Sequence, residues 1–155
     1  MEGLALSELF RGRDIEPMQK MMRERMQAEG LAYGDRSMTY NSRLAQELGK
    51  WSDTQDGGSA IHTALFRAYF VDGKNLADID VLVDTATTAG LDADAARQVL
   101  EQRTFSPQVD RDWQLARELG VTGVPTFLAA NQALVGCQPY DVLEKYIQYV
   151  QKLPS

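Results

Sequence analysis

The sequence predicts a mostly helical protein that ends in a β-hairpin and one further helix. Three observations lead to this fold class. Apolar residues three and four positions apart recur between residues 15 and 119, which is the period of an α-helix. Two short apolar runs, residues 125–130 and 133–136, are typical of strands joined by a tight turn. From Pro139 onward the helical spacing returns.

Three helices are predicted before residue 71. The first covers residues 15–29, and Pro17 is tolerated there because it falls in the first turn. Its methionines favour ordinary core packing, although a groove for a partner is an alternative reading of the same spacing. Asn41 can cap the second helix, and the third covers residues 59–70. The apolar positions expected to face inward are Ile15, Met18, Met22 and Met26, then Leu44, Leu48 and Trp51, then Ile61, Leu65 and Ala68.

Three more helices are predicted before the hairpin. Asp78 opens the first, Asp92 caps the second over residues 93–102, and Ser106-Pro107 begins the third with a cap followed by proline. A second acid stands two residues after each aspartate, and we interpret these pairs as helix caps rather than metal or acid–base pairs. The residues expected to face inward are Ile79, Leu82, Val83, Ala86, Val109, Trp113 and Ala116.

The chain is expected to form one compact domain with two parts. Residues 1–119 form a helical subdomain, and residues 120–155 form a C-terminal ββα unit. Asn131-Gln132 is the predicted tight turn between the two strands. The closing helix places Val142, Leu143, Tyr146, Ile147 and Val150 on one face.

Composition narrows the class of protein. A chain of 155 residues with 44% hydrophobic content can bury a real core. Its 22 acidic against 16 basic residues give a net charge of −6, which disfavours nucleic-acid and anionic-membrane binding. No apolar run approaches a bilayer span, and the first residues do not match a secretory signal. We therefore expect a cytoplasmic protein with neither a nucleic-acid nor a membrane partner.

The predicted strand at residues 126–130 presents a physical problem. It is apolar on both faces, which suits a central strand covered on each side. The sequence offers it only one neighbouring strand, so its other edge is open, and open apolar edges pair with other chains. An isolated hairpin is also marginally stable in water. We therefore expect a homodimer in which two hairpins pair edge to edge through residues 126–130.

Two segments resemble the end of the DsbA-like thioredoxin family. They are Gly-Val-Thr-Gly-Val-Pro-Thr-Phe at residues 120–127 and Leu-Val-Gly-Cys-Gln-Pro-Tyr-Asp-Val-Leu at residues 134–143. The nearest branch is the FrnE-like one, which is related to 2-hydroxychromene-2-carboxylate isomerases and kappa-class glutathione transferases. Residues 41–45, 65–70 and 90–92 fall where that branch has its inserted helical subdomain. The resemblance implies an incomplete thioredoxin fold: the helical subdomain plus the C-terminal hairpin and helix.

The resemblance also implies that the N-terminal half of the family's thioredoxin fold is missing from this sequence. A complete family member begins with a β-α-β segment that carries a Cys-X-X-Cys motif, whereas this sequence begins near the segment that follows it, at Glu2-Gly3-Leu4. Thiol–disulfide exchange needs an acidic attacking thiol, so we expect an oxidoreductase-family protein that is inactive alone. We expect no catalytic residue, cofactor or metal ligand in it, and a peptide or thiol substrate only if the N-terminal half is supplied. A natural loss, a misplaced start and a cut chain all remain open.

The resemblance assigns substrate binding to Thr122, Val124 and Pro125. Cis bonds are cheap only before proline, and a cis Val124-Pro125 bond would leave the carbonyl and N–H of Val124 free. The family implies that they bond the backbone of a peptide or of glutathione. A purely structural turn is the alternative.

Two single residues are interpreted without catalytic roles. Cys137, the only cysteine, could be a redox thiol, but it does not match the family's redox positions and behaves as a small core or surface residue. His62, the only histidine, excludes a catalytic triad of the serine type and a histidine metal cluster, and is assigned to helix packing. Two other functions stay open: a non-catalytic self-association or partner-binding module, and a glutathione-dependent isomerase-like protein.

Overall fold

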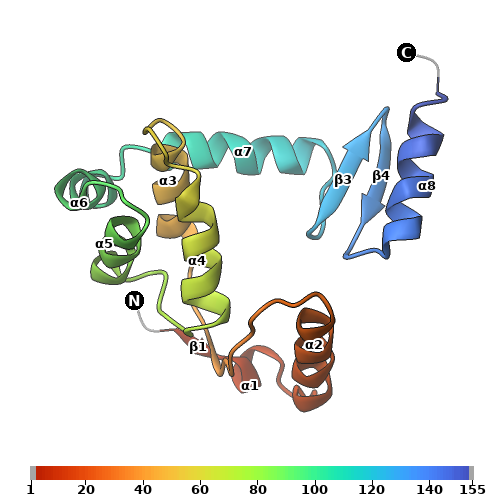
Figure 1. The fold of residues 1–155 in the computed structure, drawn as a ribbon, viewed down its shortest axis with the longest axis horizontal. Coiled ribbons are helices and arrows are strands. Elements are labelled where there is room, and N and C mark those ends of the chain that lie inside the picture. The colour runs from red at the N-terminus through yellow and green to blue at the C-terminus, as the bar shows by residue number, and fades with distance from the viewer. Residues whose placement is uncertain (1–2, 154–155) are drawn as a thin grey trace. The chain divides into compact units, whose positions relative to one another are not determined.

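The computed structural model describes residues 3–153, and it is mostly helical (Figure 1). The chain divides into two compact units, one up to Asp110 and one from Arg111 on. This division falls within α7, whereas the predicted boundary after residue 119 lies at the end of that helix. The elements in chain order are β1 (Leu4–Ala5), α1 (Leu6–Leu9), α2 (Glu16–Ala28), β2 (Met38–Thr39), α3 (Arg43–Ser52), α4 (Ala60–Phe70), α5 (Ile79–Thr88), α6 (Ala93–Gln102), α7 (Ser106–Glu118), β3 (Thr126–Ala129), β4 (Gln132–Val135) and α8 (Tyr140–Val150).

The core of the first unit lies among helices α3 to α6. Each of these helices contributes apolar side chains at helical spacing, and the stripes meet in one cluster. Leu48 and Ile61 are fully buried in it, and Trp51 is nearly so. The inward faces predicted for α3, α4 and α5 are therefore confirmed, with Leu44 and Ile79 at the margin of the core. The remaining members that are fully buried are Leu82, Ala86, Ala96 and Leu100.

Side-chain caps start α5 and α6 where the sequence predicts them, whereas the N-cap of α3 is Ser42 rather than the predicted Asn41. The carboxylate of Asp78 accepts the backbone N–H of Asp80 at 2.9 Å. That of Asp92 accepts the N–H of Ala95 at 2.7 Å. Such bonds satisfy backbone donors that have no partner inside the helix. The interpretation of these aspartates as caps is confirmed.

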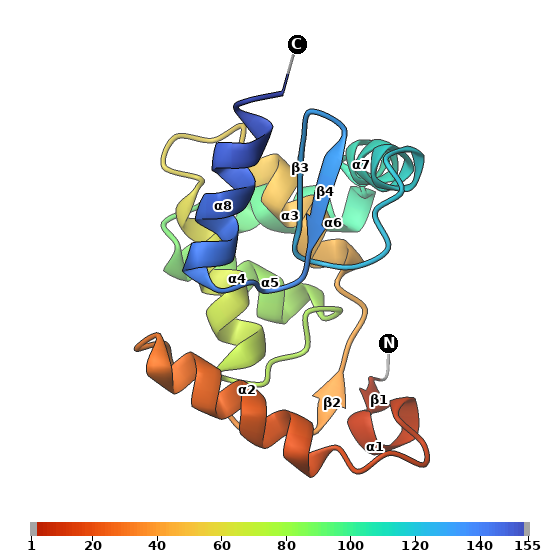
Figure 2. The same ribbon diagram turned by 90° about the vertical axis from the view of Figure 1, so that its right-hand side faces the viewer.

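The N-terminal part of the first unit contains a strand pair that the sequence analysis missed. β1 and β2 pair antiparallel, with Leu4 opposite Thr39 and Ala5 opposite Met38. Figure 2 shows this pair next to α1. Strands of two residues carry no recognisable alternation, so periodicity cannot find them.

Within residues 3–153, no helix combines the length and apolar character that a membrane span requires.

The hairpin and α8 form most of the second unit, and they lie side by side in both views (Figures 1 and 2). β3 and β4 pair antiparallel, with Thr126 opposite Val135 and Ala129 opposite Gln132. This register places the two-residue turn at Ala130-Asn131, so the predicted turn at Asn131-Gln132 is wrong by one residue. Both turn residues have positive φ, 49° and 59°, as a type I′ hairpin turn requires.

Two further predictions about burial are wrong. The side chain of Trp113, expected in the core, is 47% exposed on α7. Met18 and Met22 on α2 are each 39% exposed rather than packed in the core. Both helices have amphipathic spacing, but spacing shows only which residues share a face and not whether another element covers that face.

A buried carboxylate connects α3 to the segment between α6 and α7. Glu47 is completely buried. Its Oε1 accepts the Nε–H of Arg43 at 3.0 Å, and its Oε2 accepts the Nε–H of Arg103 at 2.7 Å. Arg43 also donates to the carbonyl oxygen of Ser106 at 3.0 Å and to Asp110. The cluster therefore ties three parts of the first unit together.

The two arginines determine the ionisation of this carboxylate. Burial by itself would raise the pKa of Glu47, but the hydrogen bonds from Arg103 and Arg43 outweigh that effect and lower its pKa. The hydrogen bond to Asp110, followed by the one to Glu47, raises the pKa of Arg43, and the hydrogen bond to Glu47 raises the pKa of Arg103. Glu47 is therefore charged and fully paired in the folded protein.

We predict that Glu47→Gln lowers the free energy of unfolding at pH 7 by about 3 kcal/mol, because it removes one partner from a buried ion cluster. Denaturant unfolding followed by circular dichroism measures this. Glu101→Gln is the matched control, because Glu101 is exposed and forms a long surface ion pair of 3.8 Å with Arg97. This substitution should lower the free energy of unfolding by less than about 1 kcal/mol. Equal costs for the two variants would contradict a stabilising role of the cluster.

The lowered pKa of Glu47 also predicts how the stability difference between the two proteins depends on pH. A carboxylate whose folded-state pKa is lowered stabilises the protein above its unfolded-state pKa and loses that effect as the pH falls through the folded-state value. The difference between the unmodified protein and Glu47→Gln should therefore be constant well above the ordinary value of 4.5 and shrink below it. Unfolding curves at a series of pH values check this sign.

Candidate functional site

A glycine-terminated helix end begins the candidate substrate-binding loop, residues 120–125. The N–H of Val121 bonds the carbonyl of Ala116 at 2.9 Å, and the N–H of Gly120 bonds that of Arg117 at 3.0 Å. This pair of bonds is the Schellman motif, which ends a helix with one residue in the left-handed conformation. Gly120 supplies that residue with φ of +70°. The chain therefore leaves α7 in a defined direction toward β3.

The predicted binding residues lie together on the exposed side of this loop. Thr122, Val124 and Pro125 are all exposed, and Val124 is 88% exposed. The peptide bond between Val124 and Pro125 is cis. The hydroxyl of Thr126 donates to the carbonyl of Gly123 at 2.6 Å, which holds the loop against the start of β3. Within residues 3–153, no hydrogen bond engages the backbone of Val124.

The register of the hairpin extends this site along the free edge of β3. The N–H of Gly136 donates to the carbonyl of Pro125 at 2.8 Å, so these two residues form a hydrogen-bonded pair. Hydrogen-bonded and non-bonded pairs alternate along an antiparallel ladder. Thr126 and Leu128 therefore turn their backbone groups away from β4. A strand laid along this edge would meet unpaired donors and acceptors at every second residue.

A tyrosine of α8 is hydrogen-bonded to the hairpin. The hydroxyl of Tyr146 donates to the carbonyl oxygen of Gln132 at 2.8 Å and lies 3.2 Å from that of Phe127. The tyrosine thus contacts both strands from one helix. Sequence analysis placed Tyr146 on the apolar face but could not show these bonds, because its partners lie 14 and 19 residues away.

The second unit has no buried side chain between residues 111 and 153. Phe127 and Leu128 are 41% and 42% exposed, although β3 is apolar throughout its middle. Because consecutive residues of a strand point to opposite faces, each face of the hairpin carries a half-exposed apolar side chain from β3. The other large apolar side chains exposed here are Trp113, Leu115, Leu119, Val124, Val135, Tyr140, Ile147 and Tyr149.

The single cysteine and the single histidine lie outside the loop. Cys137 is exposed, just after β4. His62 lies on α4, where its Nε2 is 2.7 Å from a carboxylate oxygen of Asp53. No group of three or more metal-ligating side chains occurs among the described residues. The loop therefore exposes the backbone groups of Val124 and the free edge of β3, and the exposed Cys137 directly follows Gly136, the residue that bonds Pro125 across the hairpin.

Comparison with known proteins identifies the family of this chain. A model of the DSBA-like thioredoxin domain family matches residues 3–148. A curated relative, the uncharacterized protein YwbO of Bacillus subtilis (strain 168), is 34% identical over 110 residues, which make up 70% of this chain and 55% of the relative. The chain therefore spans about half the length of that relative.

Two solved structures are similar in fold. A 2-hydroxychromene-2-carboxylate isomerase is matched with a TM-score of 0.75 and 17% identity, over 96% of this chain and 76% of the isomerase. The cytosolic disulfide reductase DsbM from Pseudomonas aeruginosa, solved with GSH, is matched with a TM-score of 0.55 and 23% identity, over 92% of this chain and 78% of the reductase. At these identities the likenesses concern the fold alone.

Two glycines of the loop provide a paired test of its geometry. Gly120 has φ of +70° and open space where a Cβ would stand, so Gly120→Ala should cost about 1 kcal/mol of stability from the left-handed backbone alone. Gly123→Ala is the control, because its Cβ would make an ordinary contact at 3.7 Å with Val135. Thermal unfolding should separate the two variants, and a control that is as destabilised as Gly120→Ala would contradict this account.

Proposed function

Because the chain belongs to the DSBA-like thioredoxin domain family, we propose that it acts in thiol–disulfide exchange and supplies the surface that holds the substrate backbone. The observation that carries this proposal is the loop at residues 120–125, where Val124 exposes an unengaged N–H and carbonyl. An extended segment could donate to the Val124 carbonyl and accept from its N–H, as in β-strand addition. Thr122 and Pro125 flank this contact.

The exchange reaction itself needs a dithiol from outside these residues. The sequence holds one cysteine, Cys137, whereas a dithiol oxidoreductase uses two. In the reaction, a thiolate attacks one sulfur of the substrate disulfide, a mixed disulfide forms, and the other substrate sulfur leaves as a thiolate. The second thiol of the dithiol then attacks the mixed disulfide and releases the reduced substrate. In this proposal a Cys-X-X-Cys segment, in the same longer protein or in another chain, faces the loop.

A main-chain donor test addresses the loop directly. Val124→Pro removes the N–H and should weaken the binding of a short blocked peptide that contains a disulfide-bonded cysteine, by roughly tenfold for a lost hydrogen bond in a water-excluded contact. Val124→Thr keeps the N–H and is the matched control. Chemical-shift titration of the labelled protein measures both dissociation constants. Unchanged binding by Val124→Pro would remove Val124 from the site.

Insulin reduction with dithiothreitol checks the assignment of the thiols. The 155 residues alone should not exceed the background rate, because they hold no dithiol. A rate above background that persists in Cys137→Ser would contradict the proposal, since it would require chemistry that this sequence does not contain.

A second candidate function is self-association through the edge of β3. The specific observation in its favour is that residues 111–153 include no buried side chain, while Phe127 and Leu128 are exposed on a two-stranded sheet. A second copy of the hairpin could pair along residues 126–130 and complete a four-stranded sheet. In this case the chain would be a non-catalytic module, and its edge would not be open to substrate.

Sedimentation velocity at micromolar concentrations distinguishes the two candidates. Edge pairing predicts a dimer, and Leu128→Lys should weaken it at least severalfold because lysine on an edge strand opposes pairing. Gln132→Lys adds the same charge to the neighbouring strand and should leave the dimer intact. A monomer throughout the concentration series would rule out self-association and leave the edge to a substrate or to another segment.

A further inference from the structure

The first unit contains a cavity of about 260 Å³ that neither proposed function uses. It lies where α1, α2, the segment before β2 and the end of α4 meet, so all of its walls belong to one unit. Most of the lining is apolar, and it includes Leu9, Phe10, Met18, Met22 and Phe70. The methionines that sequence analysis assigned to the core therefore form one wall of this cavity.

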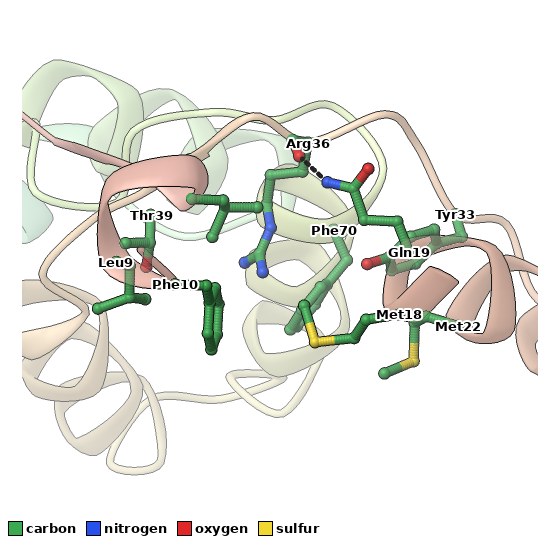
Figure 3. A pocket seen from close by; sticks show the side chains of 10 residues that line it. Leu9, Phe10, Met18, Gln19, Met22, Tyr33, Arg36, Thr39 and Phe70 are labelled. Atoms are coloured by element: carbon green, nitrogen blue, oxygen red, sulfur yellow. Dashed lines mark hydrogen bonds between the residues drawn. The ribbon is translucent and has the colours of Figure 1, made fainter. Parts of the chain in front are cut away.

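One charged side chain enters this apolar space. In Figure 3 the side chain of Arg36 runs down between Phe10 and Phe70, with its guanidinium group at the centre of the labelled residues. The segment that carries it is tied to α2, because the side-chain amide of Gln19 donates to the Arg36 carbonyl at 3.0 Å. The arginine is therefore placed in the cavity by the fold.

The charge of Arg36 has no anionic partner among the described residues. Its Nε is buried and has no hydrogen-bond partner. The guanidinium carbon lies 4.4 Å from the ring centre of Tyr69 and 5.2 Å from that of Phe70, so aromatic faces provide its compensation. The acid next to it in sequence, Asp35, pairs with Arg23 instead. Buried donors are nearly always satisfied, so this unpaired donor on a side chain that lines a cavity requires an explanation.

We propose that this cavity binds a small carboxylic acid with an apolar body. The carboxylate would accept hydrogen bonds from the guanidinium of Arg36, whose fork of donors matches two carboxylate oxygens. The apolar body would lie against Phe10, Met18 and Phe70, where the flexible thioether adapts to its shape. The cavity is smaller than those of drug-sized ligands, which begin at about 300 Å³, so the acid is small.

A carboxylate suits the lining better than a phosphate does. Arg36 is the one cation among the described lining residues. The hydroxyl of Thr39, a polar lining group, is already bonded to Tyr69 at 3.0 Å. A single guanidinium balances one negative charge, whereas a phosphate dianion would keep an uncompensated charge in an apolar cavity. The ligand class is therefore a monoanion with an apolar remainder.

The test compares phenylacetate with its neutral analogue phenylacetamide and with inorganic phosphate. Titrations followed by calorimetry and by amide chemical shifts should show phenylacetate binding roughly tenfold or more tightly than the amide, because hydrogen bonds to charged groups are the stronger class. The shifts should map to Met18, Met22 and Phe70. Equal binding of acid and amide, tighter binding of phosphate, or shifts confined to other regions would each overturn the proposal.

A pair of arginine variants locates the anion contact. Arg36→Gln should abolish the preference for the acid over the amide, while Arg25→Gln, a matched change at an exposed position of α2, should keep it. The comparison of ligands on the unmodified protein decides the question even if Arg36→Gln does not fold. Because the readout is binding and not thiol exchange, this inference stands or falls independently of the proposed function.

Discussion

Burial of apolar surface among α3 to α6 is the interaction on which the rest of the first unit depends. Leu48, Ile61 and Leu100 lose all contact with water there, and such burial is the main favourable term in folding. The ion cluster extends this core outward, because Glu47 holds Arg43, and Arg43 in turn holds the first turn of α7. A buried charge with all its partners in place resists rearrangement, since the loss of one partner leaves an uncompensated charge. Apolar packing and the ion cluster therefore both stabilise the first unit.

The second unit lacks a comparable core. Its hairpin and α8 are held by the strand ladder and by Tyr146, while the apolar side chains of β3 remain half exposed. The free edge of β3 and the loop at Val124 are consecutive in the chain. Completion of the sheet and recognition of a substrate backbone therefore use the same row of backbone groups. On the ground of family membership we propose that this edge serves thiol exchange, and this proposal requires a dithiol from outside the sequence.

The two candidate sites recognise ligands by different chemistry. At the loop, main-chain donors and acceptors of Val124 would bind any extended backbone, so the side chains of the substrate contribute little to selection. In the cavity, selection would come from the guanidinium of Arg36 and the apolar wall formed by Met18 and Phe70. Recognition of this second kind distinguishes an acid from its neutral analogue, because a polar group of the protein stays unpaired when the wrong ligand binds.

The local sequence by itself determined helices α2 to α8, the caps of α5 and α6, the hairpin and the loop, because these depend on residues a few positions apart. Asp78 and Asp92 begin their helices as the sequence predicts, and the family motif located the candidate loop. Tertiary structure decided what covers each face. The same helical spacing leaves Trp113 exposed on α7. The spacing of Arg43 and Glu47 is compatible with a pair, but the burial of Glu47 depends on packing around it and on Arg103, 56 residues away. Burial is a property of the neighbours that folding brings together, and the local pattern does not contain them.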